Sequence, residues 1–135
     1  NSQFYQSIDP IGPAFQRRSL YRTWVRSGRS PLLDVFDCPD PSTKAPARAV
    51  TTTPLQALAL LHNSFVLRMS EALAARARQS AGEDSAKQVE FAFRHALGRL
   101  PDDEERKEAA EVVAKHGLAP LCRALINSNE FVHVD

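Results

Sequence analysis

The stretch Thr53-Pro54-Leu55-Gln56-Ala57-Leu58-Ala59-Leu60-Leu61 decides the predicted fold class of this chain. It opens with a helix start signal, because Thr53 suits an N-cap, Pro54 suits the first helical position and Gln56 stands three residues after the cap. In such a capping box the threonine hydroxyl accepts from the Gln56 amide, while the glutamine side chain reaches back to the cap amide. The leucines and alanines that follow make the helix apolar on every side. We therefore expect it to be the buried central helix of an all-α domain.

Downstream of this stretch we expect four further helices, which glycines and capping residues separate. Apolar residues recur at helical spacing in three of them, and the third in order is predicted from its start and stop signals. Residues 127–135 add at most a turn or a short extended piece, in which Asn127 to Glu130 are interpreted as satisfying free carbonyls at a helix end. The four expected helices cover about residues 64–79, 85–97, 103–116 and 118–126, with Asn63 or Ser64, Ser85 and Asp102 as start signals.

Upstream of the same stretch, the pattern is less regular. Residues 1–14 contain two prolines and a glycine and are predicted to be an irregular lead-in, followed by a helix over about residues 15–27. Residues 28–50 contain four prolines and predict a long loop, which the apolar run Leu32–Phe36 attaches to the core. The prediction is one helical domain over residues 15–135, a compact bundle of about six helices with the 28–50 loop packed across it.

The composition supports a globular protein and argues against nucleic-acid binding. The 135 residues are 43% hydrophobic and 24% charged, and the net charge is +1. A charge near zero provides little counterion-release affinity for nucleic acid. No apolar run is long enough to span a bilayer, and since the chain starts without Met, we expect it to be a fragment of a larger protein.

A basic stripe is the best candidate for binding. Residues 1–30 contain five arginines and one acid, a local charge of +4. Arginine forks suit sulfate, phosphate and carboxylate groups, and aromatic faces suit sugars. The alternatives are a solvated helix face with the aromatic residues in the core, or ion pairs to acids of the loop. The candidate residues are Arg18, Arg22, Arg26 and Arg29, with Tyr21 and Trp24 nearby.

Three acids of the loop, Asp34, Asp37 and Asp40, are the second candidate site. Carboxylates at this spacing suit a cation or flank a sugar. The alternative, which we favour, is turn chemistry, because aspartates near proline and serine commonly stabilise loops.

No catalytic, cofactor or metal signature is present in the sequence. The two cysteines lack the Cys-x-x-Cys-His motif of c-type haem attachment, and the four histidines show no paired ligand spacing. There is neither a Gly-x-Ser-x-Gly elbow nor a glycine-rich phosphate loop. Cys38 and Cys122 are either a disulfide or two thiols, and we expect them to be unbridged, because a bridge needs a specific close geometry.

Several stretches, in their order and spacing, resemble one protein family. They are Arg17–Trp24, Val35–Asp40, Thr53–Leu61, Phe93–Pro101 and Leu125–Phe131. From about residue 17 to the end, the chain resembles the C-terminal part of the planctomycete PSD-one domain (domain of unknown function 1553). Two positions differ: this chain has Val50-Thr51-Thr52-Thr53-Pro54 where the family usually shows Arg-Thr-Asn-Thr-Pro, and His62-Asn63 where it often shows Asn-Asp.

The resemblance implies a context for the protein and no mechanism. Such domains look like the ends of large exported bacterial proteins, so the resemblance implies that the parent protein is in the periplasm or cell envelope. We expect a non-catalytic structural or interaction module whose partners are other domains of the parent chain. Two alternatives stay open: binding of a sulfated or acidic polysaccharide by the arginine face, and an accessory half of an enzyme site that upstream domains complete.

Overall fold

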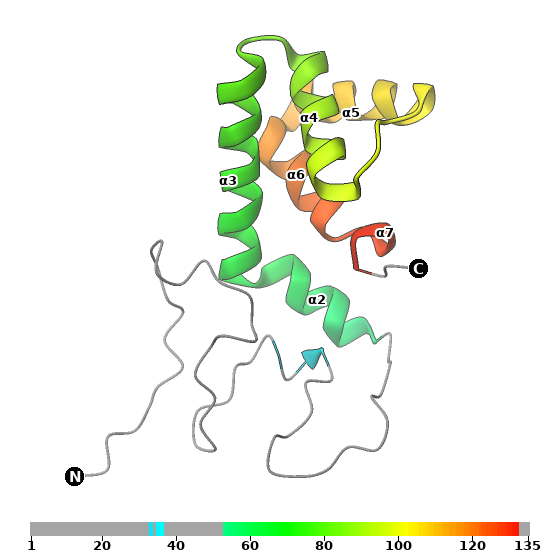
Figure 1. The fold of residues 1–135 in the computed structure, drawn as a ribbon. Coiled ribbons are helices and arrows are strands. Elements are labelled where there is room, and N and C mark those ends of the chain that lie inside the picture. Colours follow the sequence, from blue (N-terminus) through cyan, green and yellow to red (C-terminus); the bar gives the residue numbers. More distant parts are fainter. Residues whose placement is uncertain (1–32, 34, 37–52, 133–135) are drawn as a thin grey trace, which may run out of the picture. The chain divides into compact units, whose positions relative to one another are not determined.

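The computed structural model describes residue 33, residues 35–36 and residues 53–132 of the chain. In these described residues all regular secondary structure is helical, with six helices from α2 to α7 and no strand (Figure 1). This confirms the predicted all-α class. The lead-in 1–14, the helix expected over residues 15–27 and most of the 28–50 loop lie outside the described residues. The chain divides into two units, Asn1–Ala59 and Leu60–Asp135.

Helix α2 covers Pro54–His62 and begins with the predicted capping box. The Gln56 amide donates to Thr53 Oγ1 at 3.3 Å, and the Thr53 amide donates to Gln56 Oε1 at 3.0 Å. The prediction that this helix forms the buried centre is wrong, because Gln56 is the only buried residue of α2. An apolar pattern on every side of a helix does not indicate which other helices have a face that fits against it. Here the core is formed by α3, α4, α5 and α6 instead.

Helix α6 (Leu118–Ile126) takes the central position in the second unit. It packs against α3 (Ser64–Ala81), α4 (Ser85–Leu97), α5 (Asp103–His116) and α7 (Asn129–Val132). Five of its nine residues are buried. In Figure 1 the long α3 runs beside α4, and α6 lies against both.

The core of this unit combines small residues of α3 and α4 with larger residues of α4 and α6. Ala74, Ala77 and Ala92 are fully buried, which lets the backbones of α3 and α4 approach closely. The space between the helices is filled by Val89, Phe93, Leu118, Leu121, Cys122 and Leu125. The sequence predicted an apolar face on one side of α3, α4 and α6, and these three helices pack together.

The predicted start signals are correct for α3 and α5 and wrong by one residue for α4. Asn63 Oδ1 accepts from the Phe65 amide at 2.9 Å, and Asp102 forms the full capping box with Glu105. The N-cap of α4 is Asp84 instead of Ser85, and its Oδ1 accepts from the Lys87 amide at 3.2 Å. A carboxylate is a strong N-cap and favours the positive end of a helix, which explains the earlier start.

The helix ends also follow the sequence signals. Gly98 ends α4 with a φ of +74°, a left-handed conformation that glycine adopts without steric cost. After α6, Asn127 Nδ2 donates to the Arg123 carbonyl and Ser128 Oγ donates to the Leu125 carbonyl, each at 2.7 Å. These two bonds confirm the structural interpretation for Asn127 and Ser128, whereas Glu130 binds Arg99 instead of a helix-end carbonyl.

Candidate functional site

The site residues predicted from the sequence lie outside the described residues. This applies to the basic stripe and to the loop acids, namely Arg18, Tyr21, Arg22, Trp24, Arg26, Arg29, Asp34, Asp37 and Asp40. Both candidate sites therefore stay predictions. The described part of the chain offers two other features with functional chemistry, one on α2 and one in the second unit.

The first feature is the leucine face of α2, made of Leu55, Leu58 and Leu61. Their exposed fractions are 61%, 53% and 41%. Gln56 lies on the opposite side of the helix, at about 160° from Leu58 at 100° per residue. Its side chain is buried, and its Nε2 donates to the Val35 carbonyl at 3.0 Å. One side of α2 thus receives an upstream segment of its own chain, while the leucine side is exposed.

In the segment that Gln56 binds, Leu33 and Val35 have helical backbone conformation. The Phe36 amide donates to the Leu33 carbonyl at 3.1 Å, and Leu33, Val35 and Phe36 are half-buried. Whether the apolar run attaches the long loop to the core stays a prediction, because most of residues 28–50 lie outside the described residues.

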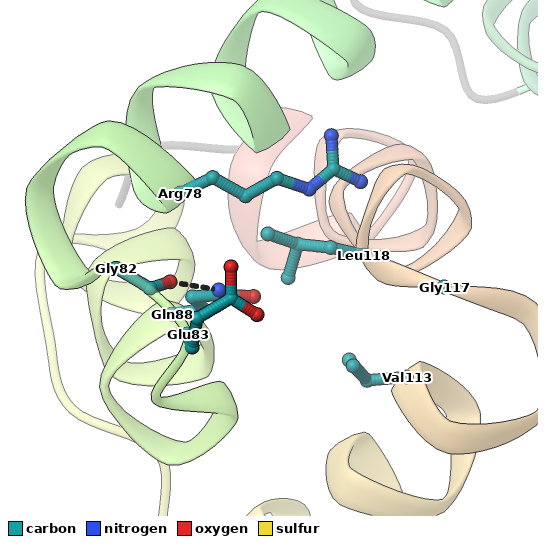
Figure 2. A pocket seen from close by; sticks show the side chains of 7 residues that line it. All are labelled: Arg78, Gly82, Glu83, Gln88, Val113, Gly117 and Leu118. Atoms are coloured by element: carbon teal, nitrogen blue, oxygen red, sulfur yellow. Dashed lines mark hydrogen bonds between the residues drawn. The ribbon is translucent and has the colours of Figure 1, made fainter.

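The second feature is a pocket of about 350 Å³ in the second unit, which we call the α3–α6 pocket. Its lining comes from the end of α3, the start of α4, the end of α5 and the start of α6. Figure 2 shows Arg78 extending from α3 toward Leu118, with Glu83 turned toward the same opening. The complete lining is Arg78, Gly82, Glu83, Gln88, Val113, Gly117 and Leu118.

Polar and apolar groups occupy different parts of the α3–α6 pocket. Val113 is half-buried and supplies the exposed apolar surface of the pocket, while Leu118 is 1% exposed and lies beneath it. Gln88 is held in place because its Nε2 donates to the Gly82 carbonyl (Figure 2). Among the described residues, neither the Arg78 guanidinium nor the Glu83 carboxylate forms an ion pair or side-chain hydrogen bond. Within the part of the chain that the structure describes, the pocket therefore presents an exposed cation and an exposed anion without a partner, beside the apolar side chain of Val113.

A charged cluster near the C-terminus has a structural role. Arg99 lies just after α4 and binds Glu105 at the start of α5. It also binds Glu130 in α7, with 2.7 Å from Nε to Oε1 and 2.8 Å from Nη2 to Oε2. Its guanidinium carbon lies 5.9 Å from the centre of the Phe93 ring. All guanidinium nitrogens of Arg99 thus have partners, which leaves none for a ligand.

Ion pairing in this cluster shifts the pKa values of its members. The Arg99 side chain, and then the Asp102 amide, lower the pKa of Glu105 to about 2. Hydrogen bonds from Arg99 also lower the pKa of Glu130, and the two carboxylates raise the pKa of Arg99. All three groups are charged at neutral pH, which is what a structural ion pair requires.

Other chemistry is weakly represented among residues 33, 35–36 and 53–132. No group of three or more metal-binding side chains comes together there. Cys122 is a free, fully buried thiol, and burial raises its pKa to about 11, so the reactive thiolate is disfavoured at neutral pH. No helix in this part of the chain has the length and apolar character to cross a membrane.

The α3–α6 pocket was missed from the sequence. Arg78, Glu83 and Gln88 look like ordinary solvated or capping residues, and nothing in their spacing relates them to Val113 or Leu118. The only local signal is that the pocket lies where two helix-ending glycines, Gly82 and Gly117, interrupt the chain. The packing of α3 against α6 brings these two helix ends together.

Comparison with known proteins identifies a family and no function. Residues 6–113 match the family model PSD1, described as a protein of unknown function (DUF1553). Four of the five stretches that carried the resemblance lie inside this range, and Leu125–Phe131 lies beyond it. No curated protein and no solved structure gave a significant match.

Proposed function

The chain belongs to the PSD1 family (DUF1553), whose function is unknown, and from this premise we propose that it is an interaction module of a larger protein. The contact surface is the leucine face of α2, Leu55, Leu58 and Leu61. Its occupant is an uncharged apolar surface of another domain of the same parent protein.

The exposure of these three leucines is the observation that carries the proposal. Fully burying a leucine side chain is worth about 1.5–3 kcal/mol, and each of these retains 41% to 61% of its exposure. Contiguous apolar helix faces of this kind commonly lie in a groove of a partner, with anchors three or four residues apart.

The charge on α2 indicates what kind of partner fits. The helix contains no Asp, Glu, Lys or Arg. Polyanions and nucleic acids bind through cations, so α2 has nothing to attract them. An apolar protein surface is the chemistry that matches the leucine face.

The opposite side of α2 supports an intrachain occupant. Gln56 there already binds the carbonyl of Val35, an upstream residue of the same chain. A second contact from the parent protein on the leucine side would continue an interface that α2 already makes. Such a role needs no catalytic residue in this chain, and it agrees with an exported multidomain parent.

Site-specific cross-linking in the full-length parent protein tests this proposal. A 4-benzoylphenylalanine placed at Leu58 is expected to cross-link to an apolar segment of another domain of the same chain. The same probe at Glu104, an exposed residue of α5, is the matched control and is expected to give no defined product. The double change Leu55→Gln, Leu61→Gln should abolish the Leu58 cross-link while changing stability by only about 0.5 kcal/mol per exposed site.

Three results would overturn the proposal. They are equal cross-linking from Leu58 and Glu104, cross-links that join two copies of the same segment, and cross-links to lipid.

A further inference from the structure

The α3–α6 pocket combines features that the interaction module does not use. We propose that it binds a small zwitterion with an aliphatic substituent, the chemistry of a free aliphatic α-amino acid. Arg78 takes the carboxylate, Glu83 takes the ammonium group, and Val113 contacts the aliphatic chain.

Arg78 is well placed to bind a carboxylate. Its backbone is fixed by the end of α3, because the Gly82 amide donates to the Arg78 carbonyl at 2.9 Å. Its guanidinium extends over the pocket toward Leu118 and has no hydrogen-bond partner among the described residues (Figure 2). A guanidinium fork of this kind binds a carboxylate through two parallel hydrogen bonds.

The start of α6 adds to this preference for a carboxylate. Gly117 is its N-cap and has no side chain, so no side-chain cap satisfies the first-turn amides of the helix. A carboxylate held by Arg78 beside Leu118 also faces the positive end of the α6 dipole.

The position of Glu83 favours a zwitterionic ligand over a simple anion. Its carboxylate is turned toward the same opening and forms no ion pair with Arg78 or with any other described residue (Figure 2). A phosphate or sulfate would meet one arginine and one repelling carboxylate. A ligand with both charges satisfies the two groups at once, through a charge-assisted hydrogen bond at each end.

The apolar surface of the pocket and its volume indicate the kind and size of the ligand's uncharged part. Val113 is half-buried and offers apolar surface at the opening, so an aliphatic chain lying on it leaves water, while Leu118 lies almost fully buried beneath. The volume of about 350 Å³ lies at the lower end of small-molecule sites, which span roughly 300–1,000 Å³. This size suits one amino acid and not a folded partner.

The test titrates L-leucine into the 135-residue chain. Binding is monitored by NMR, through changes in the amide resonances of the protein. L-leucine is expected to shift the resonances of Gly82, Gly117 and Leu118. N-acetyl-L-leucine lacks the ammonium charge, L-leucinamide lacks the carboxylate, and glycine lacks the aliphatic chain, so each should bind at least about tenfold more weakly.

Variants then assign the binding to this pocket. Arg78→Gln and Glu83→Gln should each weaken L-leucine binding about tenfold or more while helical circular dichroism is unchanged. Arg76→Gln and Glu71→Gln remove the same charges from exposed positions of α3 outside the pocket, and they should bind like the parent.

The proposal is wrong if L-leucine shifts none of the three resonances, or if N-acetyl-L-leucine binds as tightly as L-leucine. Equal losses in the Arg76 and Arg78 variants would also overturn it, because the binding would then depend on overall charge and not on the pocket.

Discussion

Arg99 binds Glu105 through two parallel hydrogen bonds of 2.7 Å each, from Nη1 to Oε2 and from Nη2 to Oε1. Glu105 is at the same time the N3 residue of the α5 capping box, where its Oε2 accepts from the Asp102 amide at 2.9 Å. The same guanidinium holds Glu130 of α7. One side chain therefore fixes the start of α5 and the position of the C-terminal helix.

We expect Arg99→Gln to lower the melting temperature and to increase amide hydrogen exchange in α7, because α7 has no buried residue of its own. Arg99→Lys should recover only part of the loss, since an ammonium group cannot form the two-point contact. Lys107→Gln, at an exposed site on α5, is the control. Parent-like melting and exchange in Arg99→Gln would show that the cluster holds nothing in place.

Stability should fall in acid because of Glu105. Its pKa is lowered to about 2 in the folded protein, against about 4.3 for an unperturbed glutamate, so the folded state favours the charged form. The resulting stabilisation is complete above the unfolded pKa and is lost as the pH falls from about 4.3 toward 2. Urea unfolding across this range should show the loss, and Glu105→Gln should reduce it. A Glu105→Gln profile as steep as that of the parent would contradict this assignment.

The capping box of α2 can be tested by two substitutions. Thr53→Ala removes an N-cap and should destabilise the helix by about 1 kcal/mol. Gln56→Ala should cost more, because it removes the bond to the Thr53 amide and also the one to the Val35 carbonyl. Denaturant unfolding of the two variants measures the difference. Parent-like stability in both would refute the capping box.

The thiols should be unbridged, and Cys122 should be protected. Iodoacetamide is expected to label Cys122 slowly in the native protein, because the thiol is fully buried and its pKa is raised to about 11. After denaturation without reductant, mass spectrometry should find both Cys122 and Cys38 labelled. A single unlabelled peptide pair joined by both cysteines would show a disulfide instead.

The basic stripe predicts salt-sensitive binding to polyanions. If Arg18, Arg22, Arg26 and Arg29 bind acidic polysaccharide, heparin should retain the chain at low salt and release it near physiological ionic strength, where screening acts beyond about 8 Å. Arg22→Ser, Arg26→Ser should abolish retention with helical circular dichroism intact. Loss of the fold in that variant would indicate ion pairs to Asp34, Asp37 or Asp40 instead. No retention of the parent at any salt would end this alternative.

Helix positions in this protein follow from local interactions, and for that reason they could be predicted from the sequence. Asn63, Asp102 and the Thr53–Gln56 pair cap their helices through bonds to amides two or three residues away. The error at α4 is also local, since Asp84 and Ser85 are adjacent and both are competent caps, and the carboxylate is the one used.

The tertiary structure alone decided which helix is central and where a pocket opens. The all-round apolar pattern of α2 predicted burial, but burial requires a neighbour with a matching face, and α6 has four such neighbours in α3, α4, α5 and α7. Arg78, Glu83 and Leu118 come together because α3 packs on α6, a contact between residues some forty positions apart that no local pattern records. Local hydrogen bonds are specified by nearby residues, whereas packing and pockets depend on which faces meet.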